Sequence, residues 1–405
     1  MSEFRVPDGW IKTTLGENLQ IDTGSKNAED SKEDGAYLFF TRAEETQKID
    51  TYSYDTEALF IAGEGNFRVK YYNGKFEVHQ RTYVLRKKTN EVDLQFLQKA
   101  IQPQIYKLIS TSVGSTVKSL RKPQIAEISI IIPKSKKEQQ KIAKILSEVD
   151  GAITLTKELI EKNKRLKTAL MQELLSYGID ENGQIRSPQT HKFKPSPLGD
   201  IPVEWKCVEL GKVCDVRDGT HQTPKYVSAG IPFYSVENIT NNEFKNVKFI
   251  SIEEHRKLTK NYKIEYGDVL MTRIGSIGDC KYVNWQVEAS FYVSLALLKF
   301  NEEINATYFV QYSKYQKFKN EIDLHSLPNA IPKKINLGNI SNIKILTPKS
   351  KTEQQKIADI LSSQDEKIEK LKNKLTKLNH LKTSLMQDLL SGKVRVNKLL
   401  EAKDD

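Results

Sequence analysis

The sequence predicts an α+β fold of two dissimilar modules, each followed by one long helix. The 44 residues that begin at Pro133 are repeated from Pro348, with 26 identical positions. The apolar residues of this repeat have helical spacing. The residues before each copy form short strand-like runs broken by Gly, Asn and Asp. A repeat about 200 residues long is typical of duplicated domains and far exceeds solenoid periods.

The first module is expected to span residues 1–132. Its strand-like runs are AYLFF, EALFIAG, FRVKYY, KFEVH and TYVLR, and a helix is predicted over Val92–Ile109. Trp10 recurs in the second module as Trp205, within VPDGW and IPVEW. Gly24 of the first module likewise matches Gly219 of the second. Both tryptophans are interpreted as core anchors.

The second module is expected to span residues 201–347. Its strand-like runs are IPFYSV, DVLMTRIG, CKYVNW and SFYVSLALLKF, and a helix is predicted over Ala306–Ile322. After their similar beginnings the two modules diverge, whereas the segments that follow them stay alike. A shared frame with two different inserts is what a protein needs to present two different binding surfaces.

Each module is followed by a predicted spacer helix, over residues 133–176 and 348–392. Ser135 and Ser350 are placed to cap these helices, with Glu138 and Glu353 three residues on as capping-box partners. The apolar positions of the first copy are Ile142, Ile145, Leu146, Val149, Ile153, Leu159, Ile160, Leu166, Leu170 and Leu174. Three-four spacing over some 35 residues indicates a long amphipathic helix.

So narrow an apolar stripe on so long a helix needs a partner helix. The two copies are expected to pack on each other as an antiparallel coiled coil that relates the modules by a pseudo-twofold axis; a splayed pair is the variant. Separate homodimerisation of each helix remains an alternative.

Two polar segments complete the chain. Residues 177–200 contain Pro188, Pro195 and Pro197 and are interpreted as an extended linker that returns the chain to the second module. Residues 393–405, after Gly392, are a short charged tail that is expected to fray.

The composition indicates a cytoplasmic protein with a polyanionic partner. No run approaches the 18 apolar residues of a membrane helix, and the first residues lack the apolar centre of a signal peptide. The three cysteines lack metal-ligand spacing and are expected to be reduced thiols. A net charge of +11 favours a polyanion such as nucleic acid, because neutralised phosphates release counterions.

No catalytic motif is found in the sequence. It has no GxGxxG after a strand, no Walker loop and no Asn-Pro-Pro-aromatic segment of the kind that amino-methyltransferases use. The six histidines form no metal-ligand pattern, so no metal or cofactor is expected in this chain.

The order of module, P-x-S-x-x-E-Q-Q-K-I-A helix, linker with L-G-x-I-P-x-x-W, module and helix resembles the specificity subunit of type I restriction–modification enzymes. DGTHQTPKYVSAGIPFYSVENI and GDVLMTRIGSIG in the second module are similar to target-recognition-domain signatures. ALFIAGEG and FEVHQRTYVL in the first are similar to another subtype, but the first module lacks the DGxHxTP and GDVLxTRxG segments.

The resemblance implies a non-catalytic DNA-recognition subunit. Each target-recognition domain would recognise one half of a bipartite, asymmetric site in double-stranded DNA. The helices would set the gap between the halves and dock two modification (methyltransferase) subunits, after which two restriction (motor-nuclease) subunits can join. S-adenosylmethionine, ATP and magnesium would belong to these partners.

Base discrimination in the major groove needs Arg or Lys for guanine, Asn or Gln for adenine, and Ser or Thr for either, while Glu can accept from cytosine. The loop residues of these types that we select as DNA-binding candidates are Ser25, Lys26, Thr41, Arg42, His79, Gln80 and Arg81 in the first module, and His221, Gln222, Thr223, Lys225, Ser235, Glu237, Asn238, Thr272, Arg273 and Ser276 in the second.

Each candidate also has an ordinary structural interpretation. Arg273 could form an internal ion pair or a phosphate contact, and His221 could stabilise its own turn. Thr41–Arg42 and Ser235–Asn238 follow strand-like runs, so they could be turn residues. For the whole chain, the alternatives are a self-contained methyltransferase or restriction enzyme and a coiled-coil scaffold for protein interactions.

Overall fold

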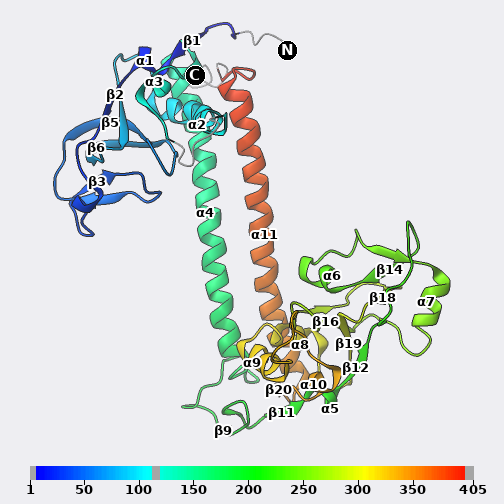
Figure 1. Ribbon diagram of the computed structural model, residues 1–405. Coiled ribbons are helices and arrows are strands. Elements are labelled where there is room, and N and C mark those ends of the chain that lie inside the picture. Colours follow the sequence, from blue (N-terminus) through cyan, green and yellow to red (C-terminus); the bar gives the residue numbers. More distant parts are fainter. Residues whose placement is uncertain (1–5, 112–118, 397–405) are drawn as a thin grey trace, which may run out of the picture. The chain divides into compact units, whose positions relative to one another are not determined.

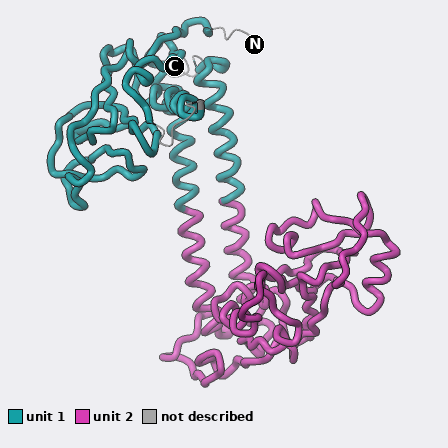
Figure 2. Tube along the Cα trace, viewed as in Figure 1, with its two compact units in different colours: residues 1–158, 372–405 teal, residues 159–371 magenta. Residues whose placement is uncertain are grey.

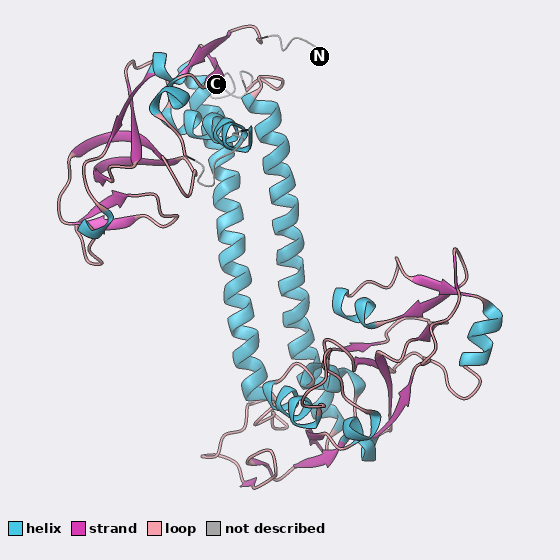
Figure 3. Cartoon of the chain, viewed as in Figure 1, coloured by secondary structure: helices cyan, strands magenta, loops and turns pink. Residues whose placement is uncertain are grey.

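The structure, a computed structural model, describes residues 6–111 and 119–396 (Figure 1). It divides into two compact units (Figure 2). Unit 1 comprises residues 1–158 and 372–405, and unit 2 comprises residues 159–371. Each unit therefore contains one module together with a part of each long helix. Both units mix helices and strands (Figure 3), so the predicted α+β class is confirmed.

The module of unit 1 is built on one six-stranded sheet of order β2-β7-β5-β6-β3-β4. The strands are β2 (Leu19–Thr23), β3 (Tyr37–Phe40), β4 (Gln47–Ile49), β5 (Tyr54–Ala62), β6 (Lys70–Val78) and β7 (Thr82–Lys87). Only β3 and β6 pair in parallel; the other neighbours are antiparallel. The predicted runs FRVKYY and KFEVH largely fall in one long strand, β6.

A second layer of unit 1 connects this sheet to the helices. It contains the antiparallel pair β1 (Trp10–Thr14) and β8 (Ser129–Pro133) and the helices α1 (Leu15–Asn18), α2 (Leu94–Thr111) and α3 (Lys122–Ala126). The short helix η1 (Ala28–Asp30) lies in the loop between β2 and β3. Trp10 is buried in the core of this layer, as predicted. The same core contains Ile142 and Leu146 from one long helix and Leu389 from the other, so module and helices share it.

Unit 2 has the same arrangement, in which an antiparallel strand pair lies between the module and the long helices, but its module has two smaller sheets. The pair β11 (Trp205–Glu209) and β20 (Lys344–Pro348) corresponds to β1 and β8, and Trp205 is fully buried. One sheet has the order β12 (Cys214–Asp218), β19 (Leu295–Phe300), β16 (Val269–Thr272), β17 (Cys280–Tyr282). The other has the order β13 (Tyr226–Val227), β15 (Lys248–Ile250), β14 (Ile231–Tyr234), β18 (Ser290–Phe291).

The helices of this module are α5 (Leu210–Val213), α6 (Val236–Asn241), α7 (Ile252–Leu258), α8 (Ala306–Tyr312), α9 (Gln316–His325) and α10 (Leu337–Ser341). The single helix predicted over Ala306–Ile322 is thus two helices, α8 and α9. At the break between them, Lys314 Nζ lies 2.8 Å from Asp365 Oδ2. The Tyr315 hydroxyl lies 2.7 Å from the Ser176 hydroxyl. These contacts join the module to the long helices.

The long helices are α4 (Lys136–Leu174) and α11 (Lys351–Leu390). Each would extend about 60 Å at 1.5 Å per residue. The hydroxyls of Ser135 and Ser350 accept hydrogen bonds from the N–H groups of Glu138 and Glu353, at 3.4 and 3.3 Å. The serine caps are therefore confirmed. The two glutamate side chains do not complete a capping box, because they bind arginines instead.

In each unit the two helices run antiparallel. In unit 1 Lys382 of α11 binds Asp150 of α4 at 2.7 Å, and beyond α11 Arg395 binds Glu138 at the start of α4. In unit 2 Lys167 pairs with Asp365, and the linker residue Ile179 donates to Glu353 at the start of α11.

A buried amide pair lies between the helices in unit 2. The Gln364 side-chain amide donates to the Asn163 side-chain oxygen at 2.9 Å and to the Asn163 carbonyl oxygen at 3.1 Å. Both residues are buried. Counted through the repeat, the positions equivalent to Asn163 and Gln364 hold Leu378 and Val149. The amide pair is therefore specific to this pairing of unlike helices.

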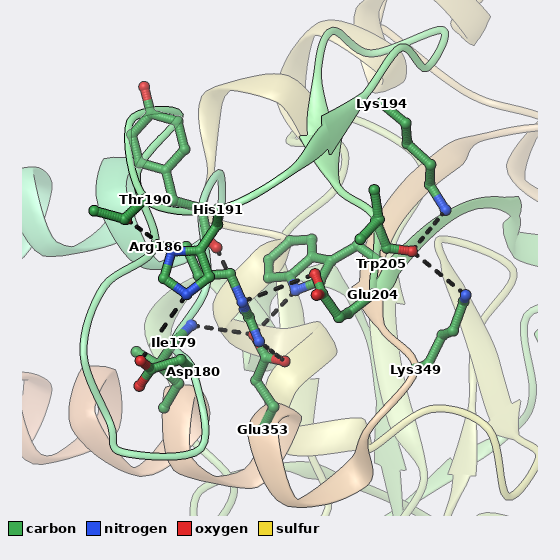
Figure 4. A network of polar contacts seen from close by, with 12 residues as sticks. Ile179, Asp180, Arg186, Thr190, His191, Lys194, Glu204, Trp205, Lys349 and Glu353 are labelled. Carbon is green, nitrogen blue, oxygen red and sulfur yellow. Dashed lines mark hydrogen bonds and ion pairs between the residues drawn. The ribbon is translucent and has the colours of Figure 1, made fainter.

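The segment after each helix docks on the start of the other helix. In unit 2 the guanidinium of Arg186 binds Glu353 through two hydrogen bonds of 2.6 and 3.1 Å, and Trp205 Nε1 donates to the same carboxylate at 3.0 Å (Figure 4). In unit 1 the guanidinium of Arg395 binds Glu138 through two hydrogen bonds of 2.7 and 2.9 Å.

Two sequence-based expectations change with these contacts. Residues 177–200 are not simply an extended linker, because Ile179 and Arg186 are buried and β9 (Phe193–Lys194) pairs with β10 (Ile201–Pro202). The tail after Gly392 does not fray at once, because Val396 is buried in the core of unit 1. Residues 397–405 lie outside the described part of the chain.

One aspartate in each unit links the module to both helices. Asp150 binds Lys99 of α2 at 2.6 Å as well as Lys382. Burial alone would raise the pKa of Asp150, but the hydrogen bonds from the two lysines outweigh it and hold the pKa below its usual value. Asp365 binds Lys314 and Lys167 in the same way, and its pKa is lowered for the same reason.

Candidate nucleic-acid interface

Four loops of unit 1 meet beside the ends of β2, β3, β5 and β6. The His79 N–H donates to the Phe40 carbonyl at 3.0 Å, and the Gln80 N–H donates to the Lys26 carbonyl at 2.9 Å. The Gly63 N–H donates to the Arg81 carbonyl at 2.8 Å. These bonds bring together all seven of the candidates from the first module, which the sequence places in three separate segments.

The seven candidates of unit 1 differ in exposure. Ser25, Arg42, Gln80 and Arg81 are exposed and Lys26 is half-buried, whereas Thr41 and His79 are buried. The Thr41 hydroxyl accepts a hydrogen bond from the Ala43 N–H at 3.2 Å, and His79 Nδ1 accepts one from the Arg81 N–H at 3.0 Å. Thr41 and His79 therefore shape the loops that carry the arginines.

The buried imidazole of His79 is neutral at neutral pH. Burial lowers the pKa of His79, and the neighbouring guanidiniums of Arg42 and Arg81 lower it further. A neutral ring is consistent with its role as the acceptor of the Arg81 N–H.

Sequence reasoning missed Glu64 in this cluster. Glu64 Oε2 lies 3.0 Å from Arg81 Nη1 and 3.6 Å from Arg42 Nη1. Its loop turns at Gly65, whose φ of +83° lies in the left-handed region that favours glycine. The run G-E-G after an apolar strand was a usable signal, because an acid between two glycines at a strand end is presented by a tight turn.

In unit 2 the corresponding loops are organised around Asp218, at the end of β12. Arg273 Nη1 and His221 Nε2 both bind the Asp218 carboxylate, and Arg273 Nε donates to the Ile335 carbonyl at 3.2 Å. Arg273 is only 8% exposed. Of the roles considered for Arg273, the geometry favours the internal ion pair, and His221 likewise stabilises its own turn.

The other candidates of unit 2 fall into two groups. Thr272 is buried and accepts a hydrogen bond from the Asp279 N–H at 3.0 Å. Asn238 is also buried, where it accepts from the Ser235 N–H at 2.8 Å and closes the turn at the start of α6. Those that remain accessible are His221, Gln222, Thr223, Lys225, Glu237 and Ser276, with Ser235 half-buried.

The two modules present their loops from the same frame. A Cβ at Gly24 would lie 1.8 Å from the Val78 carbonyl oxygen, and one at Gly219 would lie 2.5 Å from that of Phe291, so both strand ends need glycine for close approach. Lys26 forms a parallel bridge with His79, as Thr220 does with Tyr292.

The loops after β5 and β16 also correspond. The Leu120 N–H donates to the Gly63 carbonyl at 2.8 Å, and the Ile335 N–H donates to that of Arg273 at 3.0 Å. Gly65 and Gly275 follow two residues later with φ of +83° and +86°. Gly63 thus corresponds to Arg273, and Glu64 to Ile274. The frame is repeated while the exposed side chains differ.

Two features are absent from the part of the chain that the structure describes. Residues 6–111 and 119–396 contain no group of three or more His, Cys, Asp or Glu side chains that could hold a metal ion. No helix in these ranges is long and apolar enough to cross a membrane.

Comparison with known proteins relates both modules to one family. A family model described as the type I restriction modification DNA specificity domain matches residues 7–165 and 202–380. The specificity subunit of the type I restriction enzyme EcoDI from Escherichia coli is 31% identical over 232 residues, which cover 53% of this chain. That match spans 51%, about half, of the EcoDI subunit's length.

A second relative and two solved structures match almost the whole chain. The type I restriction enzyme MjaVIII specificity subunit from Methanocaldococcus jannaschii is 25% identical and covers 98% of this chain and 96% of its own. The crystal structure of a type I restriction–modification S subunit from M. genitalium has a TM-score of 0.66 at 20% identity, over 96% of this chain and 97% of its own.

The other structure comes from a study of complex assembly and conformational transition in the type I restriction–modification system. It has a TM-score of 0.52 at 15% identity and covers 96% of this chain and 100% of its own. At these identities the two structures support the fold alone.

Proposed function

This chain belongs to the type I restriction modification DNA specificity family, and from that membership we propose that it is the non-catalytic DNA-recognition subunit of a type I restriction–modification complex. Each module recognises one half of a bipartite, asymmetric site. The two long helices set the gap between the half-sites and dock the modification subunits.

The observation that carries the proposal is the repeated loop frame with unlike side chains. Unit 1 presents Arg42, Gln80 and Arg81 from it, whereas unit 2 presents Gln222, Thr223 and Lys225. Arg favours guanine, Gln favours adenine, and Ser or Thr can bond to either. One frame with two sets of base-recognising groups suits a site whose halves differ in sequence.

Charge supports the same function. The net charge of +11 provides the sequence-independent attraction to phosphates that positions a protein on duplex DNA before bases are compared. The exposed Lys225 and the half-buried Lys26 are suited to phosphates, because an ammonium is a point charge without the fixed fork of a guanidinium.

The partners follow from family membership. Two modification subunits dock on α4 and α11, and two restriction subunits join the complex after them. These partners hold S-adenosylmethionine, ATP and magnesium, and this chain contributes recognition.

The test compares the chain alone with the chain bound to its modification subunits. In gel-shift assays on duplex DNA, both should bind, with affinity that falls steeply between about 50 and 200 mM salt because phosphate contacts release counterions. Labelled S-adenosylmethionine should transfer methyl groups to DNA only when the modification subunits are present. Methyl transfer by the purified chain alone, or binding that does not respond to salt, would contradict the proposal.

A further inference from the structure

We propose that Glu64 is the positioning residue of the first module: its carboxylate holds Arg42 and Arg81 as a fork that recognises a G·C pair. The half-site of this module therefore contains at least one guanine at a position that the fork contacts. This inference rests on the proposed function and names the bases that one of its two surfaces takes.

The fork is built by the backbone of three loops. Arg42 follows β3, Glu64 follows β5, and Arg81 precedes β7. The Asn66 N–H donates to the Arg42 carbonyl at 3.4 Å, and the Gly63 N–H donates to the Arg81 carbonyl at 2.8 Å. The three side chains meet because these loops are tied together, so the cluster does not depend on a chance meeting of long side chains.

The fork is open to solvent. The side chains of Arg42, Arg81 and Glu64 are 54%, 57% and 30% exposed. Each guanidinium has five N–H donors. Arg81 donates one of them to Glu64 at 3.0 Å, whereas Arg42 forms only an ion pair with Glu64 at 3.6 Å. The remaining donors of each arginine are free to meet a ligand from outside.

The charge of the cluster favours a base edge over a phosphate. Glu64 stands between two cations, and its carboxylate would repel a phosphate that both arginines contacted. Guanine instead offers two neutral acceptors, O6 and N7, to the forked donors of an arginine. The carboxylate can also accept from the N4 amino group of cytosine, which is the other base of the same pair. Both uses require a G·C pair.

The base of the fork is held firmly. The buried ring of His79 accepts the Arg81 N–H at 3.0 Å and so fixes the backbone that carries one arginine. Gly65 turns the loop of Glu64 and lies against the other arginine's backbone, where a Cβ would be 3.5 Å from the Arg42 carbonyl oxygen. A fork with a fixed base loses little conformational entropy when it binds.

The second module has no such fork at the equivalent place. Ile274 stands in the position of Glu64, and Arg273, in the position of Gly63, turns inward to Asp218. The half-site of the second module is therefore an internal reference, since a change at Glu64 should leave its base preferences as they are.

The experiment measures base preference at every position. The complex of this chain with its modification subunits selects sites from a pool of randomised duplexes, and the selected DNA is sequenced. The variants are Glu64→Gln, Arg42→Ala and Arg81→Ala. Glu45→Gln is the matched control, because it removes the same charge from an exposed side chain on the Arg42 loop.

Arg42→Ala or Arg81→Ala should reduce the preference for guanine about 5- to 150-fold at one position of one half-site, the range expected for a bidentate arginine–guanine contact. Glu64→Gln should reduce guanine preference about 5-fold at the same position, with the other half-site unchanged. Glu45→Gln should leave all preferences unchanged.

Three results would overturn the inference. The first is that the half-site affected by the arginine variants contains no G·C pair. The second is that Glu64→Gln has the same base preferences as Glu45→Gln. The third is that Glu64→Gln weakens binding equally on all sequences. A wild-type complex that selects no sequence at all would instead overturn the proposed function, so the two failures are distinguishable.

Discussion

At the scale of single residues, the two modules use arginine in opposite ways. Arg42 and Arg81 of unit 1 are exposed, whereas Arg273 of unit 2 is buried on Asp218. The sequence predicts that all three lie in loops, because Arg42 and Arg81 lie beside strand-like runs and Arg273 lies near the end of one, before Gly275. It does not predict which way a guanidinium turns, because Asp218 is 55 residues from Arg273 and only the fold brings them together.

Arg273→Ala should destabilise unit 2 and weaken recognition of its whole half-site. Removing one partner of a buried ion pair costs about 3–5 kcal/mol, and the partial exposure of Asp218 favours the lower end of this range. Chemical denaturation of wild type and variant measures the loss of stability, and selection from randomised DNA measures the loss of recognition.

Ser276→Ala is the matched control for Arg273→Ala, because Ser276 is exposed on the same loop. It should keep wild-type stability. If Arg273→Ala were fully stable and lost preference at one base pair only, Arg273 would be a base-contacting residue and its structural role would be refuted.

At the scale of elements, the starts of the long helices show both the reach and the limit of sequence reasoning. The Ser-x-x-Glu pattern is local, so the serine caps could be predicted. The partners of Glu138 and Glu353 could not, because Arg395 and Arg186 lie in segments whose composition indicates a tail and a linker. A polar segment is buried there because one arginine in it neutralises a buried carboxylate.

Glu353→Gln should destabilise the protein more than Glu138→Gln. Glu353 Oε1 accepts from Arg186, Trp205 and the Ile179 N–H, and Arg186 is itself buried. The loss of Glu353 therefore leaves the buried Arg186 with only the more distant, half-exposed carboxylate of Glu204, at 3.9 Å. We expect a cost of about 3 kcal/mol, the lower end of the range for breaking a buried ion pair. Arg395 has a side chain that is 30% exposed and can turn toward water after Glu138→Gln.

Urea unfolding and the rate of proteolysis within residues 177–200 measure this difference. Glu353→Gln should speed cleavage of that segment, and Glu138→Gln should leave it unchanged. Equal effects of the two variants on stability would show that the burial of the arginine does not govern the cost.

At the scale of the whole molecule, the duplication made the fold predictable. Two copies of a 44-residue segment gave the two long helices, and the repeated tryptophans marked the start of each module. The likeness of the loop frames was hidden, because only glycines and backbone hydrogen bonds are shared there. Selection for different binding surfaces changes side chains, whereas the frame needs only strand ends and tight turns.

The proposed role of the helices in setting the gap can be tested by lengthening both. Seven residues inserted after Glu158 in α4 and after Leu371 in α11 keep the heptad register. They add about 10 Å, which corresponds to about three base pairs of duplex. Mapping of methylated bases in cells that express the variant with its partners should find the same half-sites with a longer gap.

An unchanged gap in that experiment would refute the role of the helices in spacing. A change in the half-site sequences themselves would show that the helices also influence base recognition. Paired insertion of seven residues that alternate Ala and Gly would be the control, because it adds the same number of residues without a stable helix to fix the distance.

The buried amide pair of Asn163 and Gln364 bears on the ancestry of the chain. A gene that joined two copies of the first half would set Asn163 against Val149, and two copies of the second half would set Gln364 against Leu378. Each buried amide would then lack its mate, at about 1–3 kcal/mol apiece. The two copies of the duplicated helix have thus become complementary to each other. Recombination that made the two copies identical again would therefore destabilise the protein.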